Sequence, residues 1–184
     1  MMKKINSICE IAEKRLVSVT WTHKINEKQA DLYKKYNKYL NVTIIVLDAL
    51  TTGGILGLLN GEYLIPKIIL AVISTITLTM NGFKVFFSFE ELINNYKKYA
   101  NEFLVERNKL EKLLSKYKSK VINGSEFSKR FDEIDEELNS LFKDAPQTSD
   151  KAVKLACKAL LEEKDNYVSK EELEAFIPES LRGK

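Results

Sequence analysis

Two ionisable side chains interrupt the most apolar part of this chain, and their positions make them the first candidates for chemistry. Residues 42–59 contain only Asp48, and residues 64–83 contain only Lys67. Each segment has the length of a membrane-spanning helix, which needs about 17–25 residues. An ionised carboxylate inside a bilayer costs up to ~2.5–3.5 kcal/mol unless a partner, a proton or water stabilises it. Asp48 is therefore predicted to face a helix interface or a water-filled pore.

A polar stripe follows the second apolar segment at helical spacing. Its members are Lys67, Ala71, Ser74, Thr77 or Leu78, and Asn81. Such a stripe either holds two helices together through hydrogen bonds or lines a pore formed by several copies, and the sequence leaves both interpretations open. The candidate pore-lining residues are Asp48, Ser74, Thr77 and Asn81.

Small residues recur every four positions along the first apolar segment, at Ala49, Gly53, Gly57 and Gly61. In lipid, close approach of two backbones across such a groove is a main source of helix association. These four residues are predicted to pack helices. The groove serves either the neighbouring segment of the same chain or a second copy.

Other chemistry has little support in the sequence. The chain lacks a phosphate-binding Gly loop, a zinc-ligand spacing and a nucleophile with a base. His23, the only histidine, is expected to be packed and hydrogen-bonded in a helical seam, with a proton sensor as the alternative. Cys9 and Cys157 lie far apart and are expected to be reduced. We predict no enzyme activity, no catalytic residue, no metal and no cofactor.

The two apolar segments predict a membrane hairpin with a turn at residues 60–63. Both flanks are rich in lysine, so the positive-inside rule places both termini in the cytoplasm. We expect no cleavable signal peptide. The lysines suit anionic lipid headgroups better than nucleic acid, and no nucleic-acid partner is expected. The alternative is the central hairpin of a soluble helical protein.

Long helices with apolar seams are predicted on both sides of the hairpin. Residues 5–39 contain no Gly or Pro, and residues 84 to about 120 continue from the membrane without a break signal. The second seam is expected to pack on the first or on its copy in a neighbouring subunit. The first seam comprises Ile5, Cys9, Ala12, Leu16, Val19, His23, Asn26, Ala30 and Tyr33, and the second Phe89, Leu92, Tyr96, Tyr99, Phe103, Glu106, Leu110, Leu113 and Tyr117.

The remaining chain predicts shorter helices with an acidic exposed face. Ser125 is expected to cap a helix with an apolar stripe, Ser149 a short helix, and Ser169 with Glu172 a last one. The predicted fold is all-α, a two-helix transmembrane hairpin flanked by long cytosolic helices in a coiled-coil-like bundle. Its regions are an N-terminal cytosolic helix (1–40), the hairpin (41–83), a long cytosolic helix (84–123) and an acidic helical C-terminal region (124–184).

Over about residues 15–120, this pattern resembles the SLATT proteins, two-transmembrane effectors associated with bacterial SMODS nucleotidyltransferase and SLOG sensor systems. The resemblance is carried by Trp21, His23, Lys24, Ala30, Tyr33 and Asn37, by residues 50–53 (Leu-Thr-Thr-Gly), and by Glu91, Tyr96, Lys97, Ala100 and residues 107–110. It identifies no ligand residue, and the acidic region beyond residue 124 departs from it.

The resemblance implies a multi-pass protein of the bacterial inner membrane that acts in an anti-phage or conflict system. Its hairpins would form a homo-oligomeric pore in the bilayer after a signal from a cytosolic sensor or a nucleotide-producing partner. The alternative function is a membrane-anchored helical adaptor without pore activity.

Overall fold

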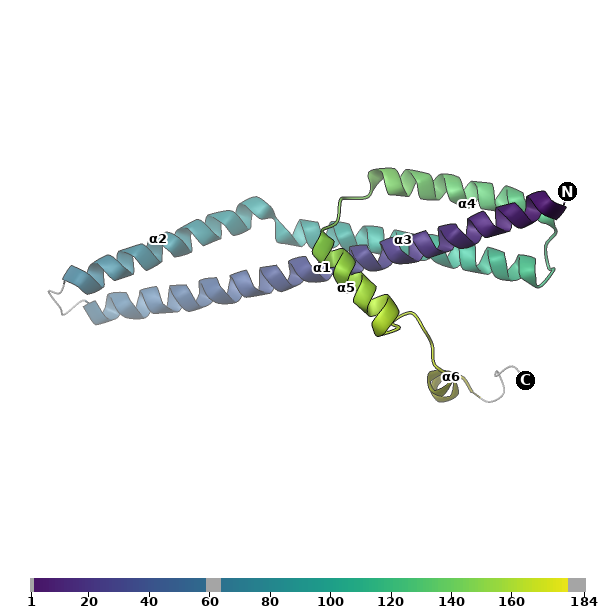
Figure 1. Cartoon of the computed structure of the whole chain (residues 1–184). Coiled ribbons are helices and arrows are strands. Elements are labelled where there is room, and N and C mark those ends of the chain that lie inside the picture. The colour runs from purple at the N-terminus through teal and green to yellow at the C-terminus, as the bar shows by residue number, and fades with distance from the viewer. Residues whose placement is uncertain (1, 59–63, 179–184) are drawn as a thin grey trace.

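The structure, a computed structural model, describes residues 2–58 and 64–178, and its regular elements there are all helices (Figure 1). The prediction of an all-α protein is confirmed. The elements are α1 (Met2–Leu58), α2 (Leu64–Phe87), α3 (Phe89–Lys118), α4 (Gly124–Asp144), α5 (Asp150–Cys157), the π-helical turn η1 (Lys158–Glu162) and α6 (Lys170–Phe176).

The longest element, α1, is one continuous helix of 57 residues. At ~1.5 Å of rise per residue it extends about 85 Å. It passes without interruption through the predicted boundary at residue 40, since no Gly or Pro precedes Gly53 to weaken it. The N-terminal helix and the first apolar segment therefore form a single rod.

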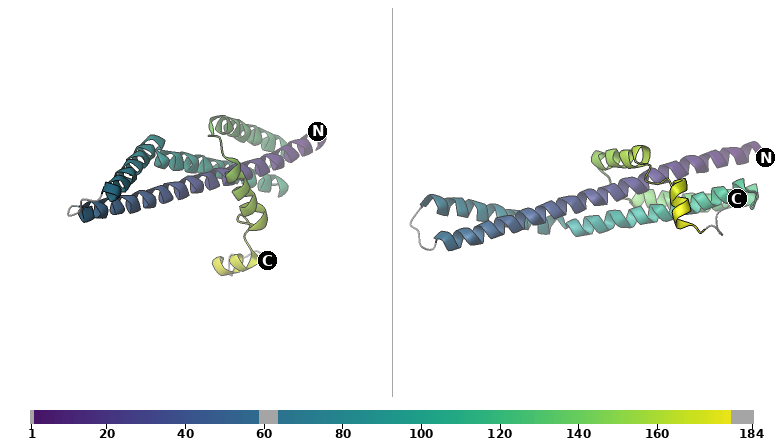
Figure 2. Two further views of the ribbon diagram at one scale, coloured as in Figure 1. Left: turned by 60° about the vertical axis from the view of Figure 1, so that its left-hand side comes forward. Right: turned by 90° about the horizontal axis from the view of Figure 1, so that it is seen from below.

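The N-terminal half of α1 packs antiparallel on α3, as Figures 1 and 2 show. The ion pair of Glu13 with Lys118 and the contact of His23 with Ala100 fix this direction. The two predicted seams meet here, because Ala12, Val19 and Ala30 of α1 and Phe103 and Leu110 of α3 are all buried. Of the two partners that the sequence left open for the second seam, the structure shows the first seam of the same chain.

A third helix, α4, completes this bundle. Its apolar stripe buries Phe127, Phe131 and Leu138 in the same core, and Arg15 pairs with Asp135 at 2.7 Å across the α1–α4 contact. The predicted cap is wrong by two positions: the Asn123 side chain, not that of Ser125, accepts a hydrogen bond from the Glu126 amide at 2.9 Å.

The C-terminal helices are shorter than the others. The Ser149 side chain caps α5, and Ser169 with Glu172 forms the capping box of α6, as predicted. Helix α5 packs on α1 and continues into η1. No residue of α6 is buried.

The C-terminal half of α1 and α2 lie side by side as the two arms of the apolar region (Figures 1 and 2). The predicted turn at residues 60–63, including Gly61, lies outside the described residues.

The expectation of an unbroken helix from the membrane to about residue 120 is wrong. Helix α2 runs four residues past Phe83 to Phe87, and Ser88 then adopts a left-handed conformation, φ 39° and ψ 53°. This break separates α2 from α3 and changes the direction of the chain (Figure 1). A non-glycine residue in this region costs about 1–3 kcal/mol, which the packing on both sides must offset.

Candidate functional site: the apolar hairpin and the bundle joined to it

The outer surface of the hairpin is apolar. Among the described residues, one helical stretch, Leu64–Lys118, which contains α2 and α3, is long and apolar enough to cross a membrane, and 6% of its apolar 18-residue window is buried. The core helix of a soluble protein buries most of its apolar side chains, so a soluble hairpin does not fit this surface. The exposed side chains are Val42, Ile45, Val46, Leu50 and Ile55 of α1 and Leu64, Ile65, Ile68, Ile69, Val72, Ile76, Leu78 and Phe83 of α2.

One face of α1 packs against α2 inside the hairpin. Ile44 is buried, and Leu47, Thr51 and Gly54 are half-buried at the three- and four-residue steps that follow. A Cβ atom on Gly54 would lie 2.8 Å from Cδ1 of Leu70, which is closer than real Cβ atoms approach. Among the glycines that the structure describes, Gly54 is therefore the one whose lack of a side chain leaves space for Leu70. Sequence reasoning missed it, although it continues the step from Ile44.

The described part of the predicted small-residue groove faces away from α2. Ala49 and Gly53 are exposed, and a Cβ atom on Gly53 would meet nothing within 4 Å. The surroundings of Gly57 and Gly61 lie outside the described side chains. Ala49 and Gly53 therefore do not pack the two arms of one chain together, and their contact with a second copy stays a prediction.

Three residues of the predicted polar stripe of α2 lie against α1. Thr77 is buried, and Ser74 and Asn81 are half-buried. Each side chain bonds to a carbonyl oxygen of its own helix: Ser74 Oγ to Leu70 at 2.9 Å, Thr77 Oγ1 to Ile73 at 3.0 Å and Asn81 Nδ2 to Thr77 at 3.1 Å. The Ser74 and Thr77 hydroxyls and the Asn81 amide nitrogen therefore have hydrogen-bond partners within α2, whereas Lys67 and Ala71 of the same stripe are exposed.

Asp48 does not join that stripe. Its side chain is exposed, and within the described residues its carboxylate has no hydrogen bond or ion pair. Its backbone carbonyl accepts the Thr52 hydroxyl at 2.9 Å. The structure therefore brings Ser74, Thr77 and Asn81 together and places Asp48 on another face of the hairpin.

A second polar group lies in the bundle, at the seam of α1 and α3. His23 is buried, and its Nδ1 donates to the Ala100 carbonyl oxygen at 2.8 Å. Burial lowers the pKa of His23, against the opposing effect of that hydrogen bond and of Glu27. His23 is the packed, hydrogen-bonded residue that the sequence predicted, with its proton on Nδ1 and its ring neutral near pH 7.

Lys24 is the next residue of this group and is only 4% exposed. Its ammonium pairs with Glu27 at 2.7 Å and with Asp165, which follows η1, at 3.0 Å. Burial alone would lower the pKa of Lys24, but the hydrogen bonds to Glu27 and Asp165 outweigh burial and raise it. Lys24 therefore stays charged and ties the loop after η1 to α1.

Gln29 connects the same face of α1 to α5. Its Oε1 accepts hydrogen bonds from the Ser149 amide at 2.8 Å and the Ser149 hydroxyl at 2.7 Å. The Tyr96 hydroxyl of α3 also donates to the Gln147 carbonyl oxygen. These three hydrogen bonds hold residues 147–149, which precede α5, against the seam of α1 and α3. Sequence reasoning predicted none of them.

An apolar helical hairpin joined to a polar bundle by one long helix defines a membrane-associated helical protein. The chain belongs to the SMODS and SLOG-associating 2TM effector domain family 4, whose model matches residues 10–172. The match includes α4, α5 and the first residues of α6, so the acidic region that the sequence set apart belongs to the family domain as far as residue 172. Neither a curated protein nor a solved structure matches the chain.

Proposed function

We propose that this protein is a bacterial inner-membrane effector of an anti-phage or conflict system, and that its hairpins assemble into a membrane-disrupting pore when triggered. The family description names a two-transmembrane effector domain. A signal from a cytosolic sensor or a nucleotide-producing enzyme is the expected trigger. Both termini lie in the cytoplasm.

The observation that carries this proposal is the outward face of α1 within the apolar region. Ala49 and Gly53 are unpacked there, and Asp48, at the side of the same groove, has no partner among the described residues. Intramembrane ionisable residues by default face a bundle interior or a water-filled cavity. Contact between copies through the groove would remove Asp48 from lipid and place it inside an assembly.

The single chain corresponds to a closed state in this proposal. Ser74, Thr77 and Asn81 face α1 and bond to their own helix, so they can line a pore only after α2 turns or separates from α1. The bundle can drive such a movement because α1 is continuous from residue 2 to residue 58.

The alternative function is a membrane-anchored adaptor that forms no pore. The exposed apolar side chains near the C-terminal end, Tyr167, Val168 and Phe176, favour it because they offer a partner a contact away from the membrane.

Substitution of Asp48 separates the two functions. Each variant is expressed with its native neighbouring genes at matched membrane levels, and growth arrest and dye entry are measured after triggering. Asp48→Leu should insert as well as wild type and lose both effects, whereas Asp48→Asn should reduce them or alter the cation preference. Thr52→Val is the matched control, since Thr52 is exposed one turn away and its hydroxyl already bonds to the backbone. Full activity in Asp48→Leu would contradict a pore that depends on this carboxylate.

A further inference from the structure

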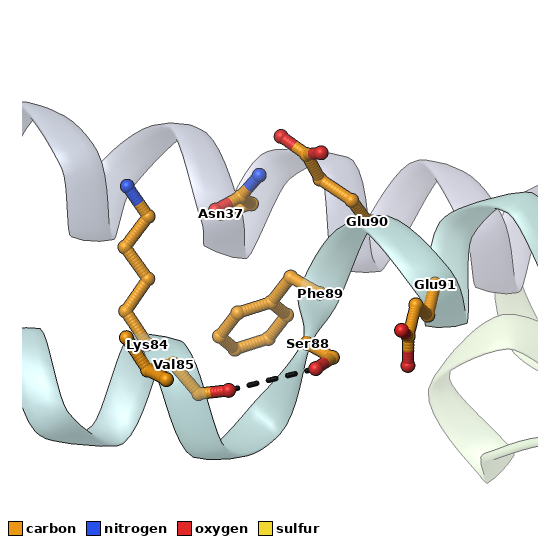
Figure 3. A pocket seen from close by; sticks show the side chains of 7 residues that line it. All are labelled: Asn37, Lys84, Val85, Ser88, Phe89, Glu90 and Glu91. Atoms are coloured by element: carbon orange, nitrogen blue, oxygen red, sulfur yellow. Dashed lines mark hydrogen bonds between the residues drawn. The ribbon is translucent and has the colours of Figure 1, made fainter.

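A cavity of about 260 Å³ lies where α1, α2 and α3 meet, beside the break at Ser88 (Figure 3). Its lining includes Asn37 of α1, Lys84 of α2 and Glu90 of α3. The volume equals that of roughly nine liquid water molecules and falls below the ~300–1,000 Å³ of pockets for drug-sized ligands. A small polar group fits such a cavity better than a cofactor does.

The two charged side chains nearest Asn37 in this cavity are unpaired and of opposite sign. Lys84 and Glu90 form no ion pair or hydrogen bond within the described residues. The Asn37 Oδ1 accepts a bond from Asn41 Nδ2 at 3.3 Å, which leaves the Asn37 Nδ2 as a free donor. Figure 3 shows Asn37 between the Lys84 and Glu90 side chains, while the carboxylate of Glu91 points away from Lys84. The cavity therefore offers two donors next to one acceptor.

The cavity also lies at the level where the apolar region ends. Phe86 and Phe87 are exposed at the end of α2, and Tyr36 and Tyr39 are exposed on α1 near Asn37. Aromatic side chains gather at the height of lipid headgroups, and lysine at a helix end extends its ammonium to the same layer. The polar groups that this layer supplies are phosphates and the amines attached to them.

We infer that this cavity binds the headgroup of a zwitterionic phospholipid with a primary amine, phosphatidylethanolamine. The phosphate accepts hydrogen bonds from Lys84 and Asn37, and the ammonium donates to Glu90. Phosphatidylglycerol has no ammonium for Glu90, and phosphatidylcholine has an ammonium without N–H groups to donate. Because the three residues come from three helices, the bound headgroup braces the joint between hairpin and bundle.

This inference rests on the proposed membrane location, and the test separates the two. The full chain is purified in mild detergent and incubated with equal amounts of the three phospholipids bearing the same acyl chains, and native mass spectrometry counts the lipids retained. Wild type should retain phosphatidylethanolamine about tenfold over phosphatidylcholine, the ratio expected for one charge-assisted hydrogen bond.

Three variants of the lining and one control variant give the test its specificity. Glu90→Gln should equalise the retention of phosphatidylethanolamine and phosphatidylcholine, and Glu90→Lys should shift the preference to phosphatidylglycerol. Lys84→Gln should lower the retention of all three, whereas Lys67→Gln, the control on the same helix, should match wild type. Equal retention of phosphatidylethanolamine and phosphatidylcholine by wild type would overturn the inference. An unchanged preference for phosphatidylethanolamine in Glu90→Gln would also overturn it. A chain that does not float with vesicles of these lipids would instead overturn the membrane location.

Discussion

Gly53 and Gly54 are neighbours in the sequence but face opposite surroundings, and this makes them a matched pair for a test of assembly. Gly54 faces Leu70 inside the hairpin, and Gly53 faces outward. We predict that Gly53→Ile weakens contact between copies and leaves the hairpin intact, whereas Gly54→Ile disturbs the hairpin itself.

The magnitudes follow from the space at each position. A Cβ atom on Gly54 would lie 2.8 Å from Leu70 Cδ1, a contact that a shift of this flexible side-chain end can relieve. The remaining atoms of isoleucine must also fit between α1 and α2, and such overpacking typically costs about 1–3 kcal/mol. A Cβ atom on Gly53 meets nothing within 4 Å in the same chain, so its intramolecular cost is close to zero. If copies approach closely at Gly53, loss of that contact should weaken association at least tenfold, or by ~1.4 kcal/mol.

Two measurements are needed for each variant. Energy transfer between labelled copies, followed on dilution into lipid, reports association, and thermal unfolding in detergent reports the stability of the single chain. Gly53→Ile should lower the energy transfer between copies and leave the thermal stability of the single chain unchanged. Unchanged association in Gly53→Ile would show that the outward groove is not the contact surface and would refute this reasoning.

Three further predictions concern topology, the C-terminal attachment and pH. A single cysteine at residue 110, in a chain without the two native cysteines, should be labelled only from the cytoplasmic side by impermeant maleimide. Asp165→Asn should raise amide hydrogen exchange from α5 to η1 but lower the free energy of unfolding by less than about 1 kcal/mol, because Lys24 keeps its pair with Glu27 at 2.7 Å. Burial holds the pKa of His23 below its ordinary value of 6.5, so the unfolded chain takes up the proton first as the pH falls. Thermal unfolding should therefore show a loss of stability below about pH 6.5 in wild type that is smaller in His23→Gln.

The long helices and their seams were predictable because their signals are repeated many times. Apolar residues recur at three- and four-residue steps through α1, α3 and α4, and each repeat supports the same face. The caps at Ser149 and Ser169 were predictable too, since each precedes a short helix after a polar segment. Local preference could not decide whether Asn123 or Ser125 caps α4, because asparagine and serine are both good N-cap residues.

The break at Ser88 has no local signal, because serine rarely adopts the left-handed conformation and neither Gly nor Pro is adjacent. A longer-range signal does exist. Continuing the inward stripe of α2 from Thr77 and Asn81 by the same steps reaches Lys84, Ser88 and Glu91, all polar. The seam of α3 instead begins one position later, at Phe89. The polar stripe of α2 and the apolar seam of α3 would therefore face different directions on one unbroken helix. The break at Ser88 lets both of them face α1.

The polar contacts of Lys24 and Gln29 could not be predicted, for a different physical reason. Their partners Asp165 and Ser149 lie more than a hundred residues away in sequence, and both α1 residues look like members of a solvated helix face. Only the fold, which lays the chain around α5 across α1, shows why a buried lysine and a buried glutamine are tolerated there.

Electrical recording on purified protein tests the central claim most directly. Wild type and Asp48→Leu are reconstituted in planar bilayers, each with the sensor or nucleotide of the native system added. The proposed function predicts discrete conductance steps from wild type and none from Asp48→Leu. Electrical silence from triggered wild-type protein that is shown to be inserted would contradict the pore, and would leave the membrane-anchored adaptor as the function of this chain.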